Sequence, residues 1–442
     1  MHDRPAQSTA LAVVVIALIA GACSPSPAPS GVDGLAAVPS SPPAAVATAT
    51  PTPVPSAIPA PGHELYGFVP YWEMDGTIAA HLAATPLTTL ALFSVSTLGD
   101  GSINTTQNGY RQIVSALGRQ LIREAHARGT RVELVYTSFG NEANVAFFGD
   151  STRMEAAIAS LVAFVGANGF DGVNVDVEGF SADMVPAYAA FLTWLHGSLV
   201  AVDPKAQVSV ATTAGPVGAA MARAAVDIGA ERVFMMGYDY RVGGSEPGAE
   251  SPILRADWGE KSLTWSLDLY IAAGVPPERT FLGLPLYGMV WPVAGPVVGA
   301  PQTGGGQVWI LKKHVALLTN PSAAPVLDQV EQVEVYFLAS DGSIGQPPNP
   351  TDGVIVPGGA SPDGSAAVSA APGTTGSAGP SATPGVTWQA VYVDSPATLA
   401  AKLSLANARG LVGAGFWAIG YERGLPAYTD LMRRFTAGDA LP

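Results

Sequence analysis

The residues best suited to chemistry lie in one short segment, residues 170–178, which reads Phe-Asp-Gly-Val-Asn-Val-Asp-Val-Glu. Its polar side chains, Asn174, Asp176 and Glu178, alternate with valines. Alternate side chains of a β-strand face opposite sides, so the three polar groups share one face at intervals of roughly 6–7 Å. Carboxylates on a strand whose other face is apolar are costly to bury. Paired carboxylates in contrasting environments are typical of general acid–base catalysis.

The elements that would position this segment are short β-type runs that alternate with helical patterns. We expect eight strands, at residues 66–70, 89–95, 131–137, 172–178, 207–213, 232–238, 280–286 and 413–418. Helical patterns lie between most of them, at residues 111–128, 152–168, 184–202, 261–273 and 396–409. Eight strand–helix repeats predict an α/β fold, a (β/α)8 TIM barrel, with a doubly wound open sheet as the alternative.

The chain is longer than such a barrel requires. A (β/α)8 barrel typically needs about 250 residues, and the excess in residues 63–442 lies mainly between Trp291 and Trp388. We therefore expect a small α+β insertion after the seventh strand, at about residues 291–390. Within it, residues 346–386 are rich in Gly, Ser, Ala and Pro, a composition that predicts a disordered loop rather than a core.

Aromatic side chains follow several of the expected strands, at the carboxyl ends where barrels of this kind place their functional groups. The first strand leads into Tyr71 and Trp72, the sixth ends in Tyr238-Asp239, and the seventh and eighth reach Tyr287 and Trp417. Aromatic faces stack on sugar rings, and carboxylates handle protons and charge. The pattern therefore indicates a carbohydrate site.

Together these segments resemble glycoside hydrolase family 18, the chitinase-like barrels. The resemblance rests on the segment 170–178, on Met-Gly-Tyr-Asp at 236–239 and on Gly-Leu-Pro-Leu-Tyr-Gly at 283–288, in the family's order. Within the family, the opening Tyr-Gly-Phe-Val-Pro-Tyr-Trp at 66–72, together with Asn174, is most similar to bacterial cell-wall and spore-cortex peptidoglycan hydrolases. The resemblance implies a catalytic barrel over residues 63–442.

It also implies a role for each matching residue. Glu178 would be the general acid and then the base, Asp176 would orient the substrate's 2-acetamido group, and Tyr238 would hydrogen-bond its carbonyl. The acetamide itself would be the nucleophile, so the reaction would retain anomeric configuration. The substrate-binding residues would be Asn174, Asp239, Trp417, Tyr71, Trp72 and Tyr287.

Asn174 departs from the many chitinases that have Asp at this position. Asn keeps a hydrogen-bond donor and an acceptor but removes one negative charge. The resemblance implies that proton sharing between Asp176 and a carboxylate at position 174 is lost, and we expect an altered pH profile.

Composition narrows the choice of partners and cofactors. The 442 residues carry 21 Lys plus Arg against 35 Asp plus Glu, a net charge of −14, which argues against nucleic acid and against adsorption to anionic lipid. No phosphate-binding Gly loop is present, and the six histidines do not cluster at ligand spacing. We therefore expect no cofactor, no metal and a monomer that binds a polysaccharide.

The amino terminus has the features of a targeting segment. Arg4 precedes an apolar run that is too short to span a bilayer comfortably and ends at Cys23, the single cysteine. Residues 1–23 therefore predict a secretory signal, and the small residues before Cys23 resemble a lipobox; the alternative is an ordinary signal peptide of a secreted protein. Residues 24–62, rich in Pro, Ala, Ser and Thr, predict an extended linker.

The expected activity is hydrolysis of β-1,4 linkages next to N-acetylglucosamine, in peptidoglycan rather than chitin. Two alternatives stay open. One is a chitinase or chito-oligosaccharidase, and the other is a non-catalytic, lectin-like protein on the same barrel, because folds outlast activities. Lectin relatives typically lose the acid that Glu178 provides here, which favours the enzyme.

Overall fold

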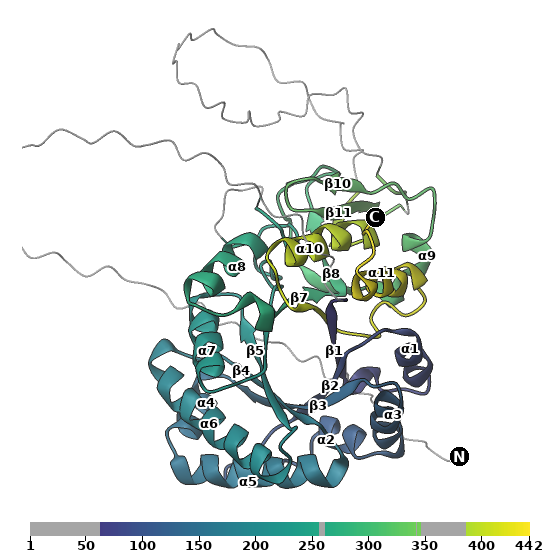
Figure 1. The fold of residues 1–442 in the computed structure, drawn as a ribbon. Helices are drawn as coiled ribbons and strands as arrows, with labels where there is room; N and C mark the ends of the chain where they lie inside the picture. Colours follow the sequence, from purple (N-terminus) through teal and green to yellow (C-terminus); the bar gives the residue numbers. More distant parts are fainter. Residues whose placement is uncertain (1–61, 256–260, 342, 346–385) are drawn as a thin grey trace, which may run out of the picture. The chain divides into compact units, whose positions relative to one another are not determined.

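The computed structural model describes residues 62–255, 261–341, 343–345 and 386–442. Eight strands form a closed barrel in the order β1-β13-β7-β6-β5-β4-β3-β2, and all neighbouring pairs are parallel (Figure 1). The barrel strands are β1 (Glu64–Pro70), β2 (Thr89–Val95), β3 (Arg131–Phe139), β4 (Gly172–Glu178), β5 (Gln207–Thr213), β6 (Arg232–Met236), β7 (Thr280–Pro285) and β13 (Gly413–Trp417).

This closed barrel confirms the predicted (β/α)8 architecture and rules out the doubly wound open sheet. Each expected strand is found within two residues of its predicted ends. The largest differences, two residues each, are at β1, which begins at Glu64, at β3, which extends to Phe139, and at β6, which stops at Met236.

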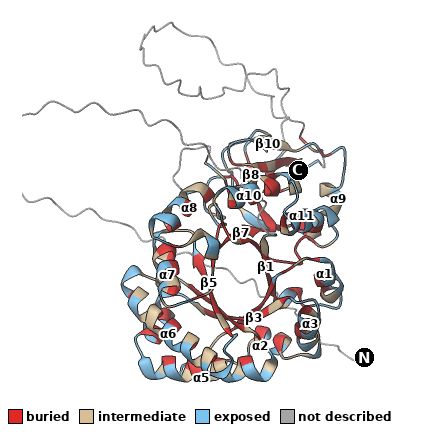
Figure 2. Cartoon of the chain, viewed as in Figure 1, coloured by how far each residue is buried: buried red, intermediate tan, exposed pale blue. Residues whose placement is uncertain are grey.

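Helices surround the barrel and expose their outer faces, while the strands are buried (Figure 2). The helices are α1 (Ile78–Ala84), α2 (Asn108–Ile113), α3 (Ala116–Ala127), α4 (Asn141–Phe148), α5 (Ser151–Asn168), α6 (Val185–Val202), α7 (Pro216–Asp227), α8 (Leu263–Ala272), α9 (Val315–Leu318), α10 (Pro396–Ala408) and α11 (Pro426–Ala437). Inside the barrel, aromatic rings form a separate apolar cluster with Phe68 and Phe234 at its centre, 4.8 Å apart.

The single helix expected over residues 111–128 is wrong, because the structure divides it into α2 and α3. Ser115 has extended backbone angles, and its hydroxyl accepts a hydrogen bond from the N–H of Gly118 at 3.1 Å. A serine in this conformation caps a new helix, so α3 begins at Ala116. The apolar periodicity continues across the break and hides it.

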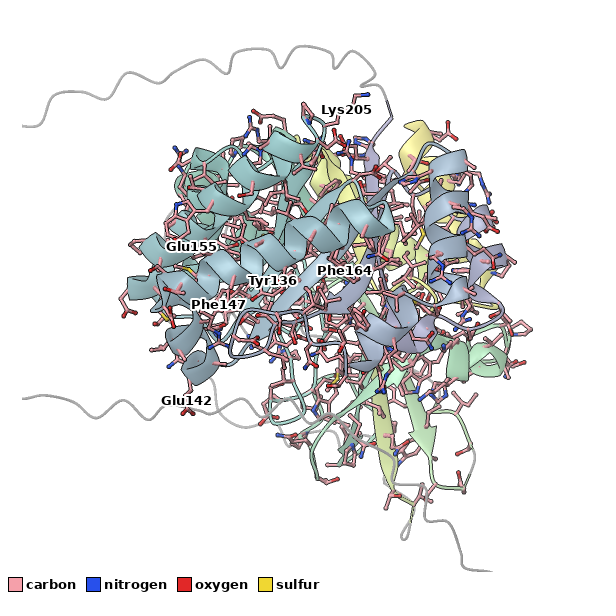
Figure 3. All side chains as sticks on the ribbon, turned by 90° about the horizontal axis from the view of Figure 1, so that it is seen from below. Tyr136, Glu142, Phe147, Glu155, Phe164 and Lys205 are labelled. Carbon is pink, nitrogen blue, oxygen red and sulfur yellow. The ribbon has the colours of Figure 1, made fainter. Side chains whose placement is uncertain are left out.

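Helices α4, α5 and α6 cover the outer side of β3 and β4 (Figure 3). Tyr136 of β3, Phe147 of α4 and Phe191 of α6 contact one another with ring centroids 5.5–6.1 Å apart. By length and composition alone, residues 182–202 are apolar enough to cross a membrane. Their buried residues, however, pack against the barrel in this cluster, as those of a core helix do.

The insertion follows β7 directly, and a five-stranded antiparallel sheet forms its centre. The sheet order is β10-β11-β12-β8-β9, formed by β8 (Tyr287–Val293), β9 (Gln307–Ile310), β10 (Val326–Asp328), β11 (Val333–Ala339) and β12 (Trp388–Val393). Trp291, Phe337 and Tyr392 are buried in its own apolar cluster. The predicted insertion after the seventh strand is therefore present, and its first strand starts at Tyr287. The low-complexity stretch predicted at 346–386 lies, except for its last residue, outside the described residues.

Candidate active site

The polar face of β4 points into the barrel as the alternation predicts. Asn174, Asp176 and Glu178 lie opposite Val135, Thr137 and Phe139 of β3. Asn174 is fully buried, Asp176 is 4% exposed, and Glu178, at the carboxyl end of the strand, is only partly buried. Exposure to solvent therefore increases from Asn174 in the barrel interior to Glu178 at the barrel mouth.

The two carboxyl groups differ in their electrostatic environment. Burial, and next the charge of Glu178, raise the pKa of Asp176 well above its usual range. Burial, and next the charge of Asp239, raise the pKa of Glu178 from its ordinary value of 4.5 to about 7. Asp176 also has a buried oxygen, Oδ1, with no hydrogen-bond partner among the described residues. Near neutral pH, Glu178 can therefore both hold and release a proton.

Tyr238 and Asp239 follow β6 and reach the same end of the barrel. Burial, followed by the charges of Asp176, Asp239 and Glu178, raises the pKa of Tyr238 well above its usual range. Tyr238 is therefore within electrostatic range of three carboxyl groups. Tyr287, at the start of β8, lies 6.3 Å from the Tyr238 ring and donates a hydrogen bond to Asp239 Oδ1 at 2.7 Å. Tyr287 is only 6% exposed, so little of its side chain is accessible from solvent. The role that its hydrogen bond indicates is to hold the Asp239 side chain in place.

Aromatic rings line the mouth beside these carboxyls. The partly buried Trp417 contacts Phe93 edge-on with centroids 4.8 Å apart, and Trp72 lies 6.2 Å away. Trp72 is 46% exposed, and its indole N–H donates to the Tyr421 hydroxyl at 3.0 Å. Tyr71 stands edge-on against Trp72 at 4.8 Å. The structure thus brings the three predicted aromatic residues together.

Two further aromatic residues at the mouth had no sequence motif to identify them. Phe93 lies in β2, two residues before its end, and a cis peptide bond joins it to Ser94; Phe139, which is 47% exposed, stacks on it at 6.5 Å. A second cis peptide joins Trp417 and Ala418. An exposed phenylalanine at a strand end is the type of signal that could have identified Phe139.

A polar network, also missed from the sequence, lies beneath Asn174. The Asn174 amide donates to Ser209 Oγ at 2.8 Å, and Ser209 donates to Glu133 Oε2 at 2.5 Å. Tyr66 donates to the same Glu133 oxygen at 2.7 Å. Burial raises the pKa of Glu133. The sequence signal was a carboxylate in the middle of an apolar strand, but nothing in the sequence assigned its partners.

The backbone at Glu178 is anchored by α4. Asn144 is fully buried and donates from Nδ2 to the carbonyl oxygens of Glu178 and Gly179, at 2.6 and 3.3 Å. Its own Oδ1 accepts from Ser138 at 2.7 Å. Gly179 has a φ of 69°, in the region that favours glycine. Asn144 therefore fixes the backbone at the carboxyl end of β4. No sequence motif in α4 predicted this role of Asn144.

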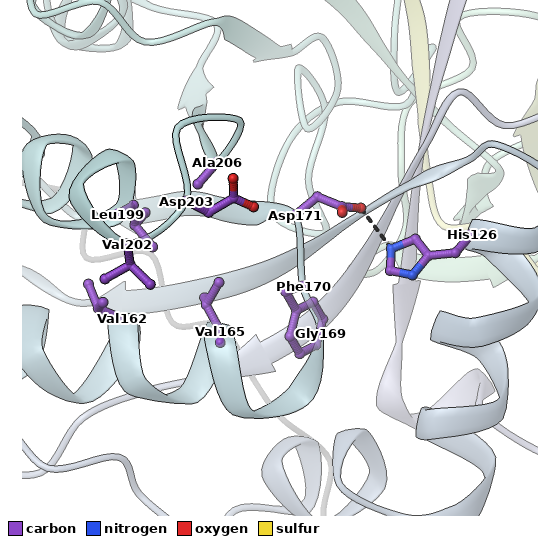
Figure 4. A pocket seen from close by; sticks show the side chains of 11 residues that line it. His126, Val162, Val165, Gly169, Phe170, Asp171, Leu199, Val202, Asp203 and Ala206 are labelled. Carbon is purple, nitrogen blue, oxygen red and sulfur yellow. Dashed lines mark hydrogen bonds and ion pairs between the residues drawn. The ribbon is translucent and has the colours of Figure 1, made fainter.

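The opposite end of the barrel has a different pocket, of about 310 Å³, between α5 and α6 (Figure 4). Asp171, just before β4, accepts hydrogen bonds from His126 at 2.9 Å and from the Val132 N–H at 2.7 Å. None of the predicted site residues lines this pocket. Within the described part of the chain, no cluster of His, Cys, Asp and Glu could hold a metal ion. Cys23 lies outside the described residues.

Comparison with known proteins supplies relatives for this fold and site. A protein described as a sporulation-specific glycosylase, YdhD, from Bacillus subtilis (strain 168) is 27% identical over 165 residues, which are 37% of this chain and 37% of that protein. The match therefore spans little more than a third of that relative's length.

Solved structures share the fold at low identity. The chitinase from Chromobacterium violaceum ATCC 12472 matches with a TM-score of 0.57 at 18% identity, over 85% of this chain and 98% of that one. The Bacillus cereus spore cortex-lytic enzyme SleL matches with a TM-score of 0.58 at 17% identity, over 84% and 74%. The profile of Glycosyl hydrolases family 18 matches residues 65–422. Because this match covers most of the chain and contains the barrel with its β4 carboxyls, the chain belongs to Glycosyl hydrolases family 18, a family of glycoside hydrolases.

Proposed function

We propose that this protein is an exported glycosidase that hydrolyses β-1,4 linkages next to N-acetylglucosamine, with the substrate's own acetamido group as nucleophile. One observation carries the proposal. Asp176 and Glu178 share one face of β4, and Glu178, at the mouth, has a pKa raised to about 7. General acids work best when their pKa lies near the operating pH.

In the first step, Glu178 gives its proton to the glycosidic oxygen as the bond from that oxygen to C1 breaks. The acetamido carbonyl oxygen attacks C1 from the other side, which forms a cyclic intermediate and retains configuration overall. In the second step, Glu178 takes a proton from a water molecule, whose oxygen then attacks C1 and reopens the ring. Glu178 thereby regains the proton it lost.

Asp176 and Tyr238 would hold the acetamido group during both steps. Asp176 would accept from the acetamido N–H and stabilise the positive charge that develops there, because a buried carboxylate interacts strongly in a low dielectric. Tyr238 would donate to the acetamido carbonyl. Asn174, whose amide is fixed by Ser209, lies next to Asp176 along the strand. Trp417 would support the sugar ring that is cleaved, with Trp72 and Tyr71 binding adjacent sugars.

Peptidoglycan is the substrate we favour over chitin. The support is the opening segment at 66–72, which resembles cell-wall hydrolases, and the similarity to a sporulation-specific glycosylase and to a spore cortex-lytic enzyme. A chitinase is also among the solved structures of this fold, so both polymers belong in the test.

The test compares wild-type protein with Glu178→Gln on purified peptidoglycan and on N-acetylglucosamine oligomers, with products identified by mass spectrometry. Glu155→Gln, an exposed glutamate on α5 (Figure 3), is the matched control. We expect products with a new N-acetylglucosamine reducing end from wild type and control but none from Glu178→Gln. Binding without any product from wild type would refute the enzyme and indicate a lectin.

The same proposal includes the location of the protein. A signal at residues 1–23 and lipid attachment to Cys23 would hold the monomeric barrel outside the cytoplasm on the linker 24–62. Mass spectrometry of the amino-terminal peptide from membrane fractions would detect the lipid. A free, uncleaved amino terminus in the cytoplasm would contradict export, and a cleaved, lipid-free protein in the medium would indicate secretion.

A further inference from the structure

Glu250 is a buried carboxyl group that no sequence motif identified, in the segment between β6 and α8. It is 3% exposed. Its Oε1 accepts a hydrogen bond from the backbone N–H of Asp239 at 3.0 Å and one from the Tyr287 hydroxyl at 3.3 Å. Its own carbonyl oxygen accepts from the Tyr240 N–H at 3.2 Å. Glu250 therefore holds the turn that presents Tyr238 and Asp239 to the site.

That turn needs to be held, because Asp239 has a φ of 60°. The left-handed region is unfavourable for an L-residue, although Asp tolerates it better than most. Glu250 fixes the Asp239 backbone, and Tyr287 fixes the side chain by donating to Oδ1 at 2.7 Å. Tyr287 also contacts Glu250, so the three residues form one connected unit.

The second oxygen of Glu250 shows which protonation state the site favours. Oε2 is buried and has no hydrogen-bond partner among the described residues. A buried, ionised carboxylate needs donors or a cation on both oxygens. Burial, and next the neighbouring Asp239 side chain, raise the pKa of Glu250 well above its usual range. A protonated Glu250 is neutral, so it avoids repulsion with that neighbouring carboxyl group.

The charged groups around Glu250 come from several elements. Asp239 and Tyr238 follow β6 and Tyr287 begins β8. Two ion pairs complete the surroundings, Arg241 with Glu331 and the buried Lys402 of α10 with Asp394. Burial lowers the pKa of Lys402, and Asp394 is the carboxyl group that acts most strongly against this lowering. Lys402 itself is engaged by Asp394.

We propose that Glu250 is a positioning residue of the active site, which fixes the Asp239 turn and remains protonated, so that it adds no negative charge beside Glu178. This inference rests on the acid–base role proposed above for Glu178. A neutral Glu250 would not repel the Asp239 carboxyl group, whereas an ionised Glu250 would repel it and open the turn. Glu250 itself contacts no substrate in this proposal.

Kinetics of two substitutions separate the two parts of the proposal. Glu250→Gln keeps the shape, the acceptor for the Asp239 N–H and a neutral donor, so kcat and the basic limb of the kcat/KM profile should stay within about twofold and a few tenths of a pH unit. Glu250→Ala removes the support, so kcat should fall about 10- to 100-fold. Glu246→Ala, an exposed glutamate on the same loop, should behave as wild type.

Opposite results would overturn the proposal. A basic limb that moves down by about half a pH unit or more in Glu250→Gln would show that Glu250 is ionised, because the substitution would then have removed a charge. A folded Glu250→Ala with wild-type kcat would show that the turn needs no support.

An infrared difference spectrum, wild type minus Glu250→Gln at neutral pH, adds a readout that does not depend on activity. We expect a protonated-carboxyl band that shifts in D2O, and its absence would refute the protonated state. If the wild type cleaves no polymer, the proposed function fails, while the infrared result still decides the state of Glu250.

Discussion

Substitution of Asp239 by Asn should move the pH profile of this enzyme toward acid. Glu178 must be protonated to act as the acid, so activity falls as pH rises through its pKa of about 7. The Asp239 charge is the second cause of that raised pKa, after burial. It therefore accounts for less than half of the rise from 4.5, about one pH unit at most, or about 1.4 kcal/mol.

The expected change in activity follows from this limit on the change in the Glu178 pKa. With a pKa of about 7, half of the Glu178 side chains are protonated at pH 7; a pKa lower by one unit would leave about one tenth protonated. In Asp239→Asn, kcat/KM at pH 7, taken as a fraction of the variant's own acid plateau, should therefore be up to about fivefold lower than the same fraction for wild type. Asn can still accept from Tyr287, so the side chain keeps its support.

The assay is kcat/KM for N-acetylglucosamine oligomers or peptidoglycan fragments, measured from pH 4 to pH 9 in constant ionic strength. Asp203→Asn, an exposed aspartate in the pocket at the opposite end of the barrel, is the control and should leave the profile unchanged. A basic limb in Asp239→Asn that stays in place or moves to higher pH would refute the electrostatic link between Asp239 and Glu178.

Three other substitutions test neighbouring parts of the site. Asn144→Ala should lower kcat about tenfold with KM within about twofold in steady-state assays, because the Glu178 carbonyl would keep the Gly140 N–H as a donor but lose the Asn144 amide, which loosens the acid; an unchanged kcat would exclude this anchoring role. Glu178→Gln should raise Tm by about 2 °C at pH 8 and less at pH 5 in thermal melts, because a group whose pKa is raised from 4.5 to about 7 in the fold loses its stabilising contribution as pH rises between these two values; equal gains at both pH values would argue against a raised pKa. Trp72→Ala should raise KM for long oligomers about 3- to 10-fold with little change in kcat, since its exposed ring lies at the mouth; equal effects on short and long oligomers would place its contact elsewhere.

Much of the fold could be predicted because the barrel repeats one local pattern. Each strand is a short β-type run that is buried on both faces, and several are preceded by a turn glycine such as Gly169, whose φ of 74° ends α5. The break at Ser115 was missed because a cap depends on one hydrogen bond, to Gly118, while apolar periodicity continues through it. Local sequence patterns therefore predict where helices and strands lie better than where a helix is interrupted.

The candidate site was predictable only where its residues share a strand or a motif. Asn174, Asp176 and Glu178 are neighbours on one face of β4, so alternation alone brings them together. Asn144 and Glu250 reach the same site from other repeats, and their partners are backbone groups that leave no trace in sequence. Asn174 is bound to Ser209, a contact that depends on the register between β4 and β5.

Several buried carboxyl groups of the described residues have cationic partners, and these differ from the carboxyl groups of the candidate site. Asp394 is buried but paired with Lys402, and Glu73 is buried but paired with Lys312 and Arg423. Such ion pairs connect the insertion and the last helices to the barrel. This structural role does not require either partner to gain or lose a proton.

Asp176, Glu178 and Glu250 differ because none of them has a cation within ion-pair distance among the described residues, and burial is the main cause of the raised pKa of each. A buried carboxyl without a cation costs the fold free energy unless it is protonated. Glu178 and Glu250 are the two of these groups whose proposed roles require a proton, and burial favours the protonated form of each. A cation placed beside Glu178 would remove that cost and, with it, the proton that the acid must give.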